Sequence, residues 1–511
     1  MKKPRLIGQC LLIAASALLL PSTGAFANPA MPGPGGMFHH ASSFDWVKHT
    51  QQTLDELKGK LSDKRLDRGQ PAARFPVTSS SVEAAHDSSI TFTAYRAPSG
   101  RVFPRIVEPL VMDAPCPTLL VLNAGSSTLK FSLYLAATPT AHCLGSGSIE
   151  VRQGRAMLVY HDSGSGADHQ EQWIAESCMD AVSLGNLMRW VGSHTQWRIV
   201  GAAHRVVHGG ARREVAARID TALISEIQGL IPMAPLHQPL CLAPILHVAR
   251  EHPDLPQVAC FDTAFHHTLD PLETLYGLPS ALSEEGLRRY GFHGLSYEYI
   301  AGVLADYDPR AATGRTLVAH LGNGASLCAM RNRISCGTTM GFSTLDGLLM
   351  GTRPGNLDPG IVLYLLRERG MSAEAVEHLL YHESGLLGVS GGVASDMRTL
   401  LASHAEGATQ AIALFVRRAV KEIGALAAVL GGLDALVFTG GIGEHAPAVR
   451  DAILDGCAWL GVTRNHDHPT GACLTTPDSQ VSAWVISTDE NAVIARHSLA
   501  LLPAPVSSEA L

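Results

Sequence analysis

The chain has 511 residues, of which 46% are hydrophobic and 17% are charged. This length allows two or three domains, each with a core of its own. The formal net charge is -7, so the sequence lacks the basic character of a protein that binds nucleic acid. The 49 glycines and 29 prolines predict short elements joined by tight turns.

The first residues have the pattern of a secretory signal. Three basic residues among the first five precede an apolar run over 11–20, and residues 25–27 read Ala-Phe-Ala, which is typical of a cleavage site. Neither this run nor any later one is long enough to span a membrane, so no membrane integration is predicted. Residues 1–116 are interpreted as a leader and linker that is signal-like over 1–27 and poorly ordered, with one helix over 43–61.

From Thr118 onward, short apolar strands alternate with helical patterns. A long helix is expected over 408–430, ending at the Gly431-Gly432 pair. Alternating strands and helices indicate an α/β fold, in which ligands bind at the carboxyl ends of strands. Strands are expected over 119–122, 199–203, 257–260, 316–321 and 435–439.

Three strands end in turns of small residues. The turns read Asn-Ala-Gly-Ser-Ser-Thr-Leu-Lys over 123–130, Gly-Asn-Gly-Ala-Ser over 322–326 and Gly-Gly-Ile-Gly-Glu over 440–444. Small residues let backbone N–H groups approach phosphate oxygens, and Lys130 adds a positive charge. The spacing differs from that of a P-loop. A plain hairpin is the alternative for any single turn, but three such turns favour nucleotide phosphate binding.

Two arginines lie in apolar or glycine-rich surroundings. Arg205 follows His204 and precedes two valines, and Arg353 lies between Thr352 and Pro354. Burying an arginine is costly unless an anion compensates its charge. Both are therefore candidate clamps for a phosphate or a carboxylate, with a salt-bridged arginine as the alternative for either one alone.

Two carboxylates end or follow expected apolar strands, Asp262 after 258–261 and Glu490 after 485–489. Magnesium takes oxygen ligands and often only one or two protein carboxylates, so either residue is a candidate ligand, and helix capping is the alternative. The histidine pairs and runs are interpreted as surface residues rather than metal ligands. They lie at 39–40, 266–267 and 466–468.

Taken in order, ten segments resemble the acetate kinase family, which belongs to a superfamily with sugar kinases, heat-shock chaperones and actin. The resemblance covers about residues 118–502 and leaves the leader unexplained. The ten segments are 123–130, 204–210, 234–239, 261–266, 289–296, 320–326, 340–358, 384–398, 440–450 and 488–496.

The resemblance implies an α/β fold with two domains of a duplicated ribonuclease-H-like (actin-like ATPase) core around a central cleft. Domain I would comprise 117–261 together with 492–511. Domain II, the nucleotide-binding domain, would comprise 262–491.

The resemblance also implies the residues of the active site. Catalytic roles would fall to Asp262, His293 and Arg353. The carboxylate substrate would be bound by Arg205, with its methyl group in a pocket of Val207, Leu236 and Phe292. The metal, Mg²⁺ with Mn²⁺ as the alternative, would be placed by Asn123 and Glu490. The nucleotide would contact Lys130, His320, Leu321, Gly322, Asn323, Gly324, Asp396, Met397, Arg398, Gly441, Ile442, Gly443, Glu444 and His445.

The implied reaction is reversible transfer of a phosphoryl group from ATP to acetate, giving acetyl phosphate and ADP by direct in-line transfer. The resemblance further implies a homodimer. A propionate or butyrate kinase of the same fold is one alternative. A nucleotide-binding protein without transferase activity is another, although the set Arg205, His293 and Arg353 would then be unnecessary.

Several positions depart from the family pattern. Gln238 replaces an asparagine, Leu295 and Tyr297 replace a threonine and a histidine, and His445 replaces an asparagine. Thr344 stands where the family has a proline that borders the acyl pocket. Because one methylene group is worth only about 1–3 kcal/mol of discrimination, the choice among acetate, propionate and butyrate is left open.

The signal-like start and the implied substrates point to different compartments. ATP, ADP and magnesium are concentrated in the cytosol, and the ten cysteines show no disulfide framework. We therefore predict a cytoplasmic protein whose leader is a misassigned start or an unused extension, with export as the alternative.

Overall fold

The computed structural model describes residues 92–96, 102–106, 115–125, 128–137, 141–194, 196–466 and 472–502. All described residues belong to one unit, Thr50–Leu511. Within the predicted leader, the described elements are an antiparallel pair of short strands, β1 (Phe92–Arg96) and β2 (Val102–Ile106). The helix expected over 43–61 lies outside the described residues.

An eight-stranded sheet has the order β7-β6-β5-β4-β3-β8-β10-β9. Strands β3 to β7 form successive antiparallel pairs, whereas β3, β8 and β10 run parallel to one another. Its strands are β3 (Cys116–Ala124), β4 (Thr128–Leu135), β5 (His142–Arg152), β6 (Arg155–Asp162), β7 (Asp168–Ile174), β8 (Trp197–Val206), β9 (Ala217–Arg218) and β10 (Gln257–Phe261).

A five-stranded sheet has the order β13-β12-β11-β14-β15. Strands β13, β12 and β11 are antiparallel neighbours, and β11, β14 and β15 run parallel. The order β13-β12-β11-β14-β15 therefore repeats the order β5-β4-β3-β8-β10 of the first sheet. The repetition confirms the predicted α/β fold with a duplicated core. The strands are β11 (Arg315–Leu321), β12 (Ala325–Arg331), β13 (Ile334–Thr338), β14 (Ala435–Thr439) and β15 (Ser482–Val485).

Helices connect and cover the strands of both sheets. Up to β11 they are α2 (Ala181–Ser193), α3 (Thr221–Gly229), η1 (Ile231–Met233), α4 (Gln238–Glu251), η2 (Ala264–Thr268), α5 (Pro271–Thr274), α6 (Ser280–Glu284), α7 (Gly294–Tyr307) and α8 (Pro309–Thr313). The later ones are α9 (Pro359–Arg367), α10 (Ala373–His378), the π-helical turn η3 (Leu379–Glu383), α11 (Gly385–Val389), α12 (Met397–Ala402), α13 (Glu406–Leu430), α14 (Gly440–His445), α15 (Pro447–Gly456), η4 (Ala458–Leu460) and α16 (Glu490–Leu501).

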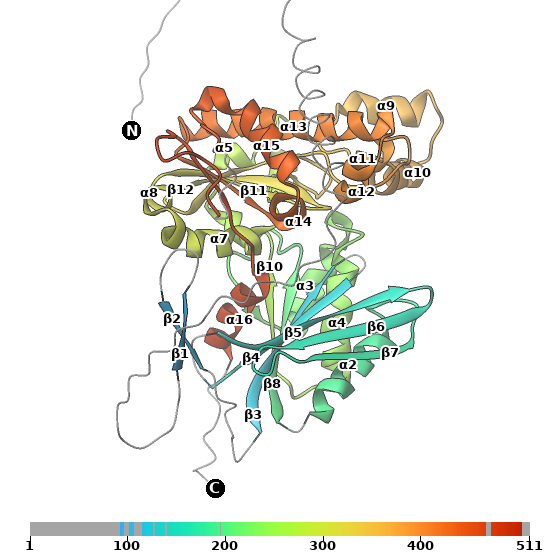
Figure 1. Cartoon of the computed structure of the whole chain (residues 1–511). Helices are drawn as coiled ribbons and strands as arrows, with labels where there is room; N and C mark the ends of the chain where they lie inside the picture. Colours follow the sequence, from blue (N-terminus) through green and yellow to red (C-terminus); the bar gives the residue numbers. More distant parts are fainter. Residues whose placement is uncertain are drawn as a thin grey trace, which may run out of the picture. The chain divides into compact units, whose positions relative to one another are not determined.

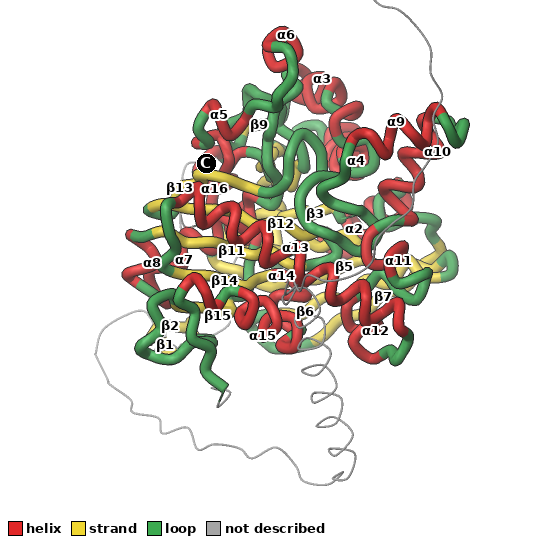
Figure 2. Tube along the Cα trace, turned by 90° about the horizontal axis from the view of Figure 1, so that it is seen from above, coloured by secondary structure: helices red, strands yellow, loops and turns green. Residues whose placement is uncertain are grey.

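The long helix α13 covers the five-stranded sheet. It contacts β11, β12 and β13 and also packs beside α15 (Figures 1 and 2). Its buried residues recur at helical spacing, as in Ile412, Phe415 and Val416. The helix ends at Gly431, whose φ of 69° is the left-handed conformation that glycine adopts readily. The helix predicted over 408–430 is confirmed, with its first residue at Glu406.

The last helix, α16, packs on the eight-stranded sheet although it follows the five-stranded sheet in the chain. It contacts β3, β8 and β10 (Figure 1). Val493, Ile494 and Ala495 are buried in one cluster with Leu119 and Val121 of β3. The sheet formed early in the sequence is therefore completed by the end of the chain.

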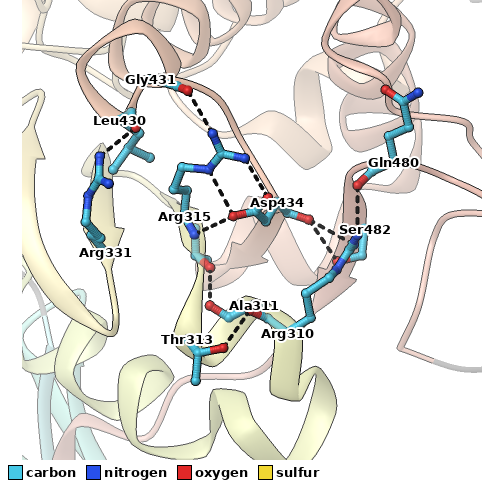
Figure 3. A network of polar contacts seen from close by, with 11 residues as sticks. Arg310, Ala311, Thr313, Arg315, Arg331, Leu430, Gly431, Asp434, Gln480 and Ser482 are labelled. Carbon is cyan, nitrogen blue, oxygen red and sulfur yellow. Dashed lines mark hydrogen bonds and ion pairs between the residues drawn. The ribbon is translucent and has the colours of Figure 1, made fainter.

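A polar network ties the start of β11 to the start of β14. Asp434 accepts hydrogen bonds from Arg315 Nε (3.0 Å), Nη2 (2.8 Å) and the backbone N–H (2.8 Å). Arg310 reaches the backbone carbonyls of Asp434 (3.2 Å) and Gln480 (3.0 Å), which connects α8 to the same strands (Figure 3). Two-point pairing of guanidinium and carboxylate is geometrically specific, so this network fixes the register of β11, β14 and β15.

One strand boundary differs from the prediction. The apolar run over 485–489 is not a strand, because β15 ends at Val485. The side chain of Asp489 instead accepts a hydrogen bond from the backbone N–H of Ala492 (3.0 Å) and caps α16. Among the described residues, no helix is both long and apolar enough to cross a membrane.

Candidate active site

Two cationic or imidazole side chains converge on the turn between β11 and β12. A Cβ atom added at Gly324 would lie 3.0 Å from Nη2 of Arg353 and 3.2 Å from Nε2 of His293. A larger residue at this position would therefore displace one of these groups. The glycine predicted from the turn pattern lies directly beside two of the predicted catalytic residues.

The guanidinium of Arg353 has no carboxylate partner among the described residues. Its Nη1 donates to the backbone carbonyl of Thr344 (2.7 Å), and burial lowers the pKa of Arg353 to about 10. A cation in a desolvated place is costly unless an anion compensates it. The arrangement leaves Nη2, which faces Gly324, free to bind an anionic ligand.

The segment before α7 holds His293 in a left-handed conformation, with φ of 58°. The preceding carbonyl of Phe292 accepts a hydrogen bond from His266 Nε2 (3.0 Å), and Ser335 Oγ donates to His266 Nδ1 (2.9 Å). Burial lowers the pKa of His266 to about 4, so its ring is neutral. This buried histidine belongs to the scaffold that orients His293. Its interpretation as a surface residue is therefore wrong, whereas His267 is exposed.

The His293 imidazole is neutral at neutral pH. Burial holds its pKa well below the ordinary value, and the nearby His320, Arg205 and Arg353 act in the same direction. The rings of His293 and His320 are stacked, with centroids 4.3 Å apart. A neutral imidazole can donate one hydrogen bond from whichever nitrogen carries the proton.

Arg205 and Asp262 form a close pair at the ends of the parallel strands β8 and β10. Arg205 Nε lies 3.0 Å from Oδ1 of Asp262, and Nη2 lies 2.5 Å from Oδ2. Nη1 donates to the carbonyl of Ala124 (3.1 Å). Burial raises the pKa of Asp262, whereas Arg205 opposes the shift. Both carboxylate oxygens are engaged, so Asp262 orients the guanidinium.

Asn123 and Glu490, separated by 367 positions, are brought together. Asn123 Nδ2 donates to Oε2 of Glu490 (2.9 Å). Burial disfavours the ionised form of Glu490, but Arg205, His320, Asn123 and Lys130 hold its pKa below the ordinary value. An ionised carboxylate and an amide oxygen suit Mg²⁺, which commonly keeps waters and substrate phosphates as its other ligands.

Two of the three turns predicted to bind phosphate, those over 322–326 and 440–444, lie close together. A Cβ atom added at Gly322 would lie 4.0 Å from the backbone nitrogen of Gly441, in the first turn of α14. Gly351 packs against Asn323, and its N–H donates to the Asn323 carbonyl (3.0 Å). Gly441 is exposed, and apart from its chain neighbours and the backbone of its own helix no atom lies within 4 Å of a Cβ added there, so a ligand can approach its backbone.

The remaining nucleotide candidates lie at different depths. Lys130 is exposed and faces Asn123 across the β3–β4 hairpin, while Ser126 and Ser127 lie outside the described residues. Exposed positions are Asp396, Arg398, Gly441 and His445. Asn323 is also exposed. Buried positions are Leu321, Met397, Ile442 and Gly443, and the partly buried ones are His320, Gly322, Gly324 and Glu444. Leu321, Ile442 and Met397 can contribute mainly through their backbones.

The residues predicted for a methyl pocket are Val207, Leu236 and Phe292. The buried side chain of Gln238 connects the segments near them. Gln238 Oε1 accepts from the His208 N–H (3.1 Å), and its Nε2 donates to the His208 carbonyl (2.9 Å). The His208 ring contacts Phe292, with centroids 5.6 Å apart. Val207 and Phe292 are buried and Leu236 is partly buried. Gln238 thus replaces the family's asparagine in a structural role.

Thr344, the departure at the acyl pocket, lies beside Arg353. Its carbonyl binds Arg353, and its side chain is buried close to Tyr381. His237 is also close to Arg353 and Arg205, and its Nδ1 is buried without a hydrogen-bond partner among the described residues. Burial lowers the pKa of His237 to about 3. Polar groups therefore surround Arg353 in addition to the apolar side chains.

Two hydroxyl groups next to His293 were not singled out by the sequence. Ser326 Oγ lies 2.8 Å from His293 Nδ1 and 2.5 Å from the hydroxyl of Tyr297. The available signal was Tyr297 itself, because it departs from the family pattern. It also lies four positions after His293, which places the two residues on the same face of α7.

Histidine-rich positions form no metal cluster in the described part of the chain. No group of three or more histidine, cysteine, aspartate or glutamate side chains is arranged to hold a metal there. His39, His40, Asp467 and His468 lie outside the described residues. The nine cysteines of the described ranges are all free.

Comparison with known proteins extends these observations. The acetokinase family matches residues 118–496. The acetate kinase of Rhodopseudomonas palustris is 51% identical over 387 residues, covering 74% of this chain and 97% of the relative. That of Methylocella silvestris is 44% identical over 398 residues, covering 75% and 98%.

Solved structures agree. The acetate kinase of Porphyromonas gingivalis has a TM-score of 0.66 and 31% identity, covering 76% of this chain and 100% of the other. A propionate kinase from Francisella tularensis has a TM-score of 0.68 and 34% identity, covering 75% and 98%. With a family match over most of its length and relatives of this similarity, the chain belongs to the acetokinase family.

Proposed function

We propose that the protein is an acetate kinase, which transfers a phosphoryl group reversibly between ATP and acetate. The observation that carries this proposal is the convergence of Arg353 and His293 Nε2 on Gly324, with no carboxylate to neutralise Arg353 within the described residues. Phosphoryl transfer spreads negative charge over the equatorial oxygens of the transferring group. Two donors aimed at one point stabilise that charge without covalent chemistry.

In the proposed reaction a carboxylate oxygen of acetate attacks the γ-phosphorus, and the bond to the bridging oxygen of ADP breaks in line with it. Acetate is already ionised at neutral pH, so no general base is required. Asp262 therefore serves by orienting Arg205, which binds the carboxylate, rather than by removing a proton. Arg353 and His293 donate to the transferring group.

The nucleotide is proposed to lie along the turns after β11 and β14, with Lys130 and the segment Asp396 to Arg398 at its margins. The closeness of Gly322 to Gly441 supports this placement, because backbone N–H groups of both turns can then face the same phosphates. Asn123 and Glu490 would hold Mg²⁺, or Mn²⁺ in its place. The metal would neutralise phosphate charge.

A propionate or butyrate kinase is the second candidate, favoured by Thr344 and by the similarity to a propionate kinase. Thr344 carries a hydroxyl group where the family pattern has an apolar proline ring, so the surroundings of the acyl chain differ from those of the family pattern. The two candidates differ only in specificity, because the pair of donors at Gly324 serves either acid.

The decisive experiment is trapping of the acyl phosphate with hydroxylamine. Purified protein is incubated with ATP, Mg²⁺ and acetate, propionate or butyrate, and the acyl hydroxamate is measured. The highest kcat/KM with acetate is expected. A higher value for propionate or butyrate would select the second candidate, and ATP binding without any hydroxamate would select a protein without transferase activity.

We also propose a homodimer. Helix α9 has no buried residue, although it carries Ile361, Leu363 and Tyr364, which are 45%, 48% and 52% exposed. An apolar helix face in contact with water is typical of an interaction surface, and a second copy would cover it.

Light scattering should give twice the chain mass, and a Leu363→Glu variant should be a monomer. A monomeric wild type would contradict the proposal.

For location, we propose the cytoplasm, because the substrates ATP and ADP are concentrated there. The free cysteines are compatible with a reducing compartment. Cell fractionation together with N-terminal sequencing tests this. A mature chain that begins at Asn28 in an exported fraction would contradict it.

A further inference from the structure

A chain of hydroxyl groups leads from α7 through β12 to the imidazole of His293. Tyr297, one turn after His293 on α7, is fully buried, and its hydroxyl lies 2.5 Å from Ser326 Oγ. Ser326, also fully buried, lies 2.8 Å from His293 Nδ1. The other ring nitrogen, Nε2, is the one next to Gly324 and Arg353. The hydroxyl chain therefore acts on the side of the ring opposite to the anion site.

The direction of these hydrogen bonds follows from counting protons. The phenol of Tyr297 stays protonated, since burial holds its pKa well above the ordinary value. Within the described part of the chain, the side-chain hydrogen-bond partner of the phenol is Ser326 Oγ. The phenol proton is therefore directed to Ser326 Oγ, which leaves the proton of Ser326 for the lone pair of His293 Nδ1.

We propose that Tyr297 and Ser326 are positioning residues that hold neutral His293 in the tautomer with its proton on Nε2. The proposal rests on the function proposed above, in which His293 donates to the transferring phosphoryl group. With the proton on Nε2, the ring presents a donor next to Arg353. With the proton on Nδ1, it would present a lone pair, which repels phosphoryl oxygens.

A comparison with His266, which bonds the carbonyl of the residue before His293, supports this reasoning. His266 is also buried and neutral, but its tautomer is set by the Phe292 carbonyl, which can only accept a hydrogen bond. His293 has no carbonyl partner at Nδ1 in the described part of the chain. A serine hydroxyl can either donate or accept, so it needs a second group to decide its direction, and Tyr297 supplies that group.

The direct test reads the tautomer in the resting protein by nitrogen-15 NMR of histidine-labelled full-length chain. The His293 signals are assigned from their loss in His293→Gln. In the wild type, Nε2 should be protonated and Nδ1 unprotonated. In Ser326→Ala the two tautomers should mix. A proton on Nδ1 in the wild type, or an unchanged tautomer in Ser326→Ala, would overturn the proposal.

Kinetics separate positioning from simple packing. Tyr297→Phe should lower kcat about threefold to tenfold, the range expected for one net hydrogen bond, and leave KM for acetate and ATP unchanged. Ser326→Ala should lower kcat further. Tyr299→Phe, which removes a hydroxyl from the same helix but outside the chain of hydroxyls, is the control and should keep the wild-type kcat.

Together, the NMR and the kinetic measurements distinguish a failure of the proposed function from a failure of the proposed roles of Tyr297 and Ser326. If the wild type forms no acyl phosphate while His293 carries its proton on Nε2, the proposed function fails and the tautomer assignment stands. If the wild type is active and Tyr297→Phe has the kcat of Tyr299→Phe, the proposed role of Tyr297 is wrong.

Discussion

Arg353 and Arg205 are both partly buried arginines, but their surroundings differ. Arg205 is bound by both oxygens of Asp262, whereas Arg353 is bound by a backbone carbonyl. A paired arginine is held in place before substrate arrives, and it can still bind a carboxylate through its free edge. Arg353, which has no carboxylate partner among the described residues, therefore gains more from binding an anion than Arg205 does.

Arg353→Ala is therefore expected to lower kcat by about 100-fold to 1,000-fold, the loss typical for removing one donor to a charged transition state. KM for acetate should change far less. Steady-state kinetics with varied acetate test this, and Arg331→Ala, which removes an arginine of β12 that bonds the Leu430 carbonyl, is the control. Near-normal turnover in a folded Arg353→Ala would remove Arg353 from the mechanism.

Glu490→Gln keeps the shape of the side chain and removes its charge. If Glu490 holds the metal, the magnesium concentration for half-maximal rate should rise at least about tenfold, because hard cations depend on anionic oxygen ligands. A magnesium titration of activity measures this, with circular dichroism as the check on folding. An identical titration curve in the folded variant would refute the assignment.

The sequence predicted the charged residues of the proposed site but not the hydroxyl groups beside them. An arginine among apolar residues or a carboxylate after a strand is unusual enough to be noticed, since such groups are costly to bury. Ser326 and Tyr297 are ordinary residues for a strand and a helix. Their role depends on the distance between α7 and β12, which no local pattern encodes.

The turn between β11 and β12 is the element on which the site depends most closely. Its glycines are required because neighbouring groups already occupy the space of a side chain, as at Gly324. The turn was predicted from its composition. The strand expected over 485–489 was predicted wrongly, because Asp489 gains a hydrogen bond by capping α16 and a local apolar pattern does not reveal that competition.

Gly324→Ala should reduce kcat by about tenfold or more without unfolding the protein, because its Cβ would crowd Nη2 of Arg353 and Nε2 of His293 and small displacements of catalytic groups are costly. Gly192→Ala is the matched control, since nothing lies within 4 Å of a Cβ added there. Kinetics and thermal melts of both variants test this. Equal activity of the two variants would show that the turn tolerates a side chain.

In the whole molecule, the five-stranded sheet depends on the Arg315–Asp434 network at the end opposite to its glycine turns. The duplicated core was predictable from the family resemblance. The network was not, because Arg310, Arg315 and Asp434 come from segments about 120 positions apart and nothing in their local sequence marks them as partners. The predicted domain limits, 117–261 with 492–511 and 262–491, stay a prediction.

Asp434→Asn should lower the free energy of unfolding at pH 7 by about 1.5–3 kcal/mol, the value of a hydrogen bond to a charged group. The Arg315 hydrogen bonds lower the pKa of Asp434 in the folded protein. Its contribution is therefore present above the unfolded pKa of about 3.9 and is lost as the pH falls through the lowered folded pKa.

Urea unfolding of wild type and Asp434→Asn at a series of pH values measures this difference. The gap between the two proteins should be constant at neutral pH and shrink below about pH 4. A gap that does not depend on pH would show that the charge of Asp434 contributes nothing.

The packing of α16 on β3 also sets an order of events during synthesis. Asn123 leaves the ribosome 367 positions before Glu490, its hydrogen-bond partner. Until α16 follows, the eight-stranded sheet keeps the apolar surface around Leu119 and Val121 uncovered, and a surface of this kind in a growing chain favours aggregation. The first half of the molecule can be made early but is finished last, so a chain interrupted anywhere before residue 490 lacks both the cover of its first sheet and one side of its active site.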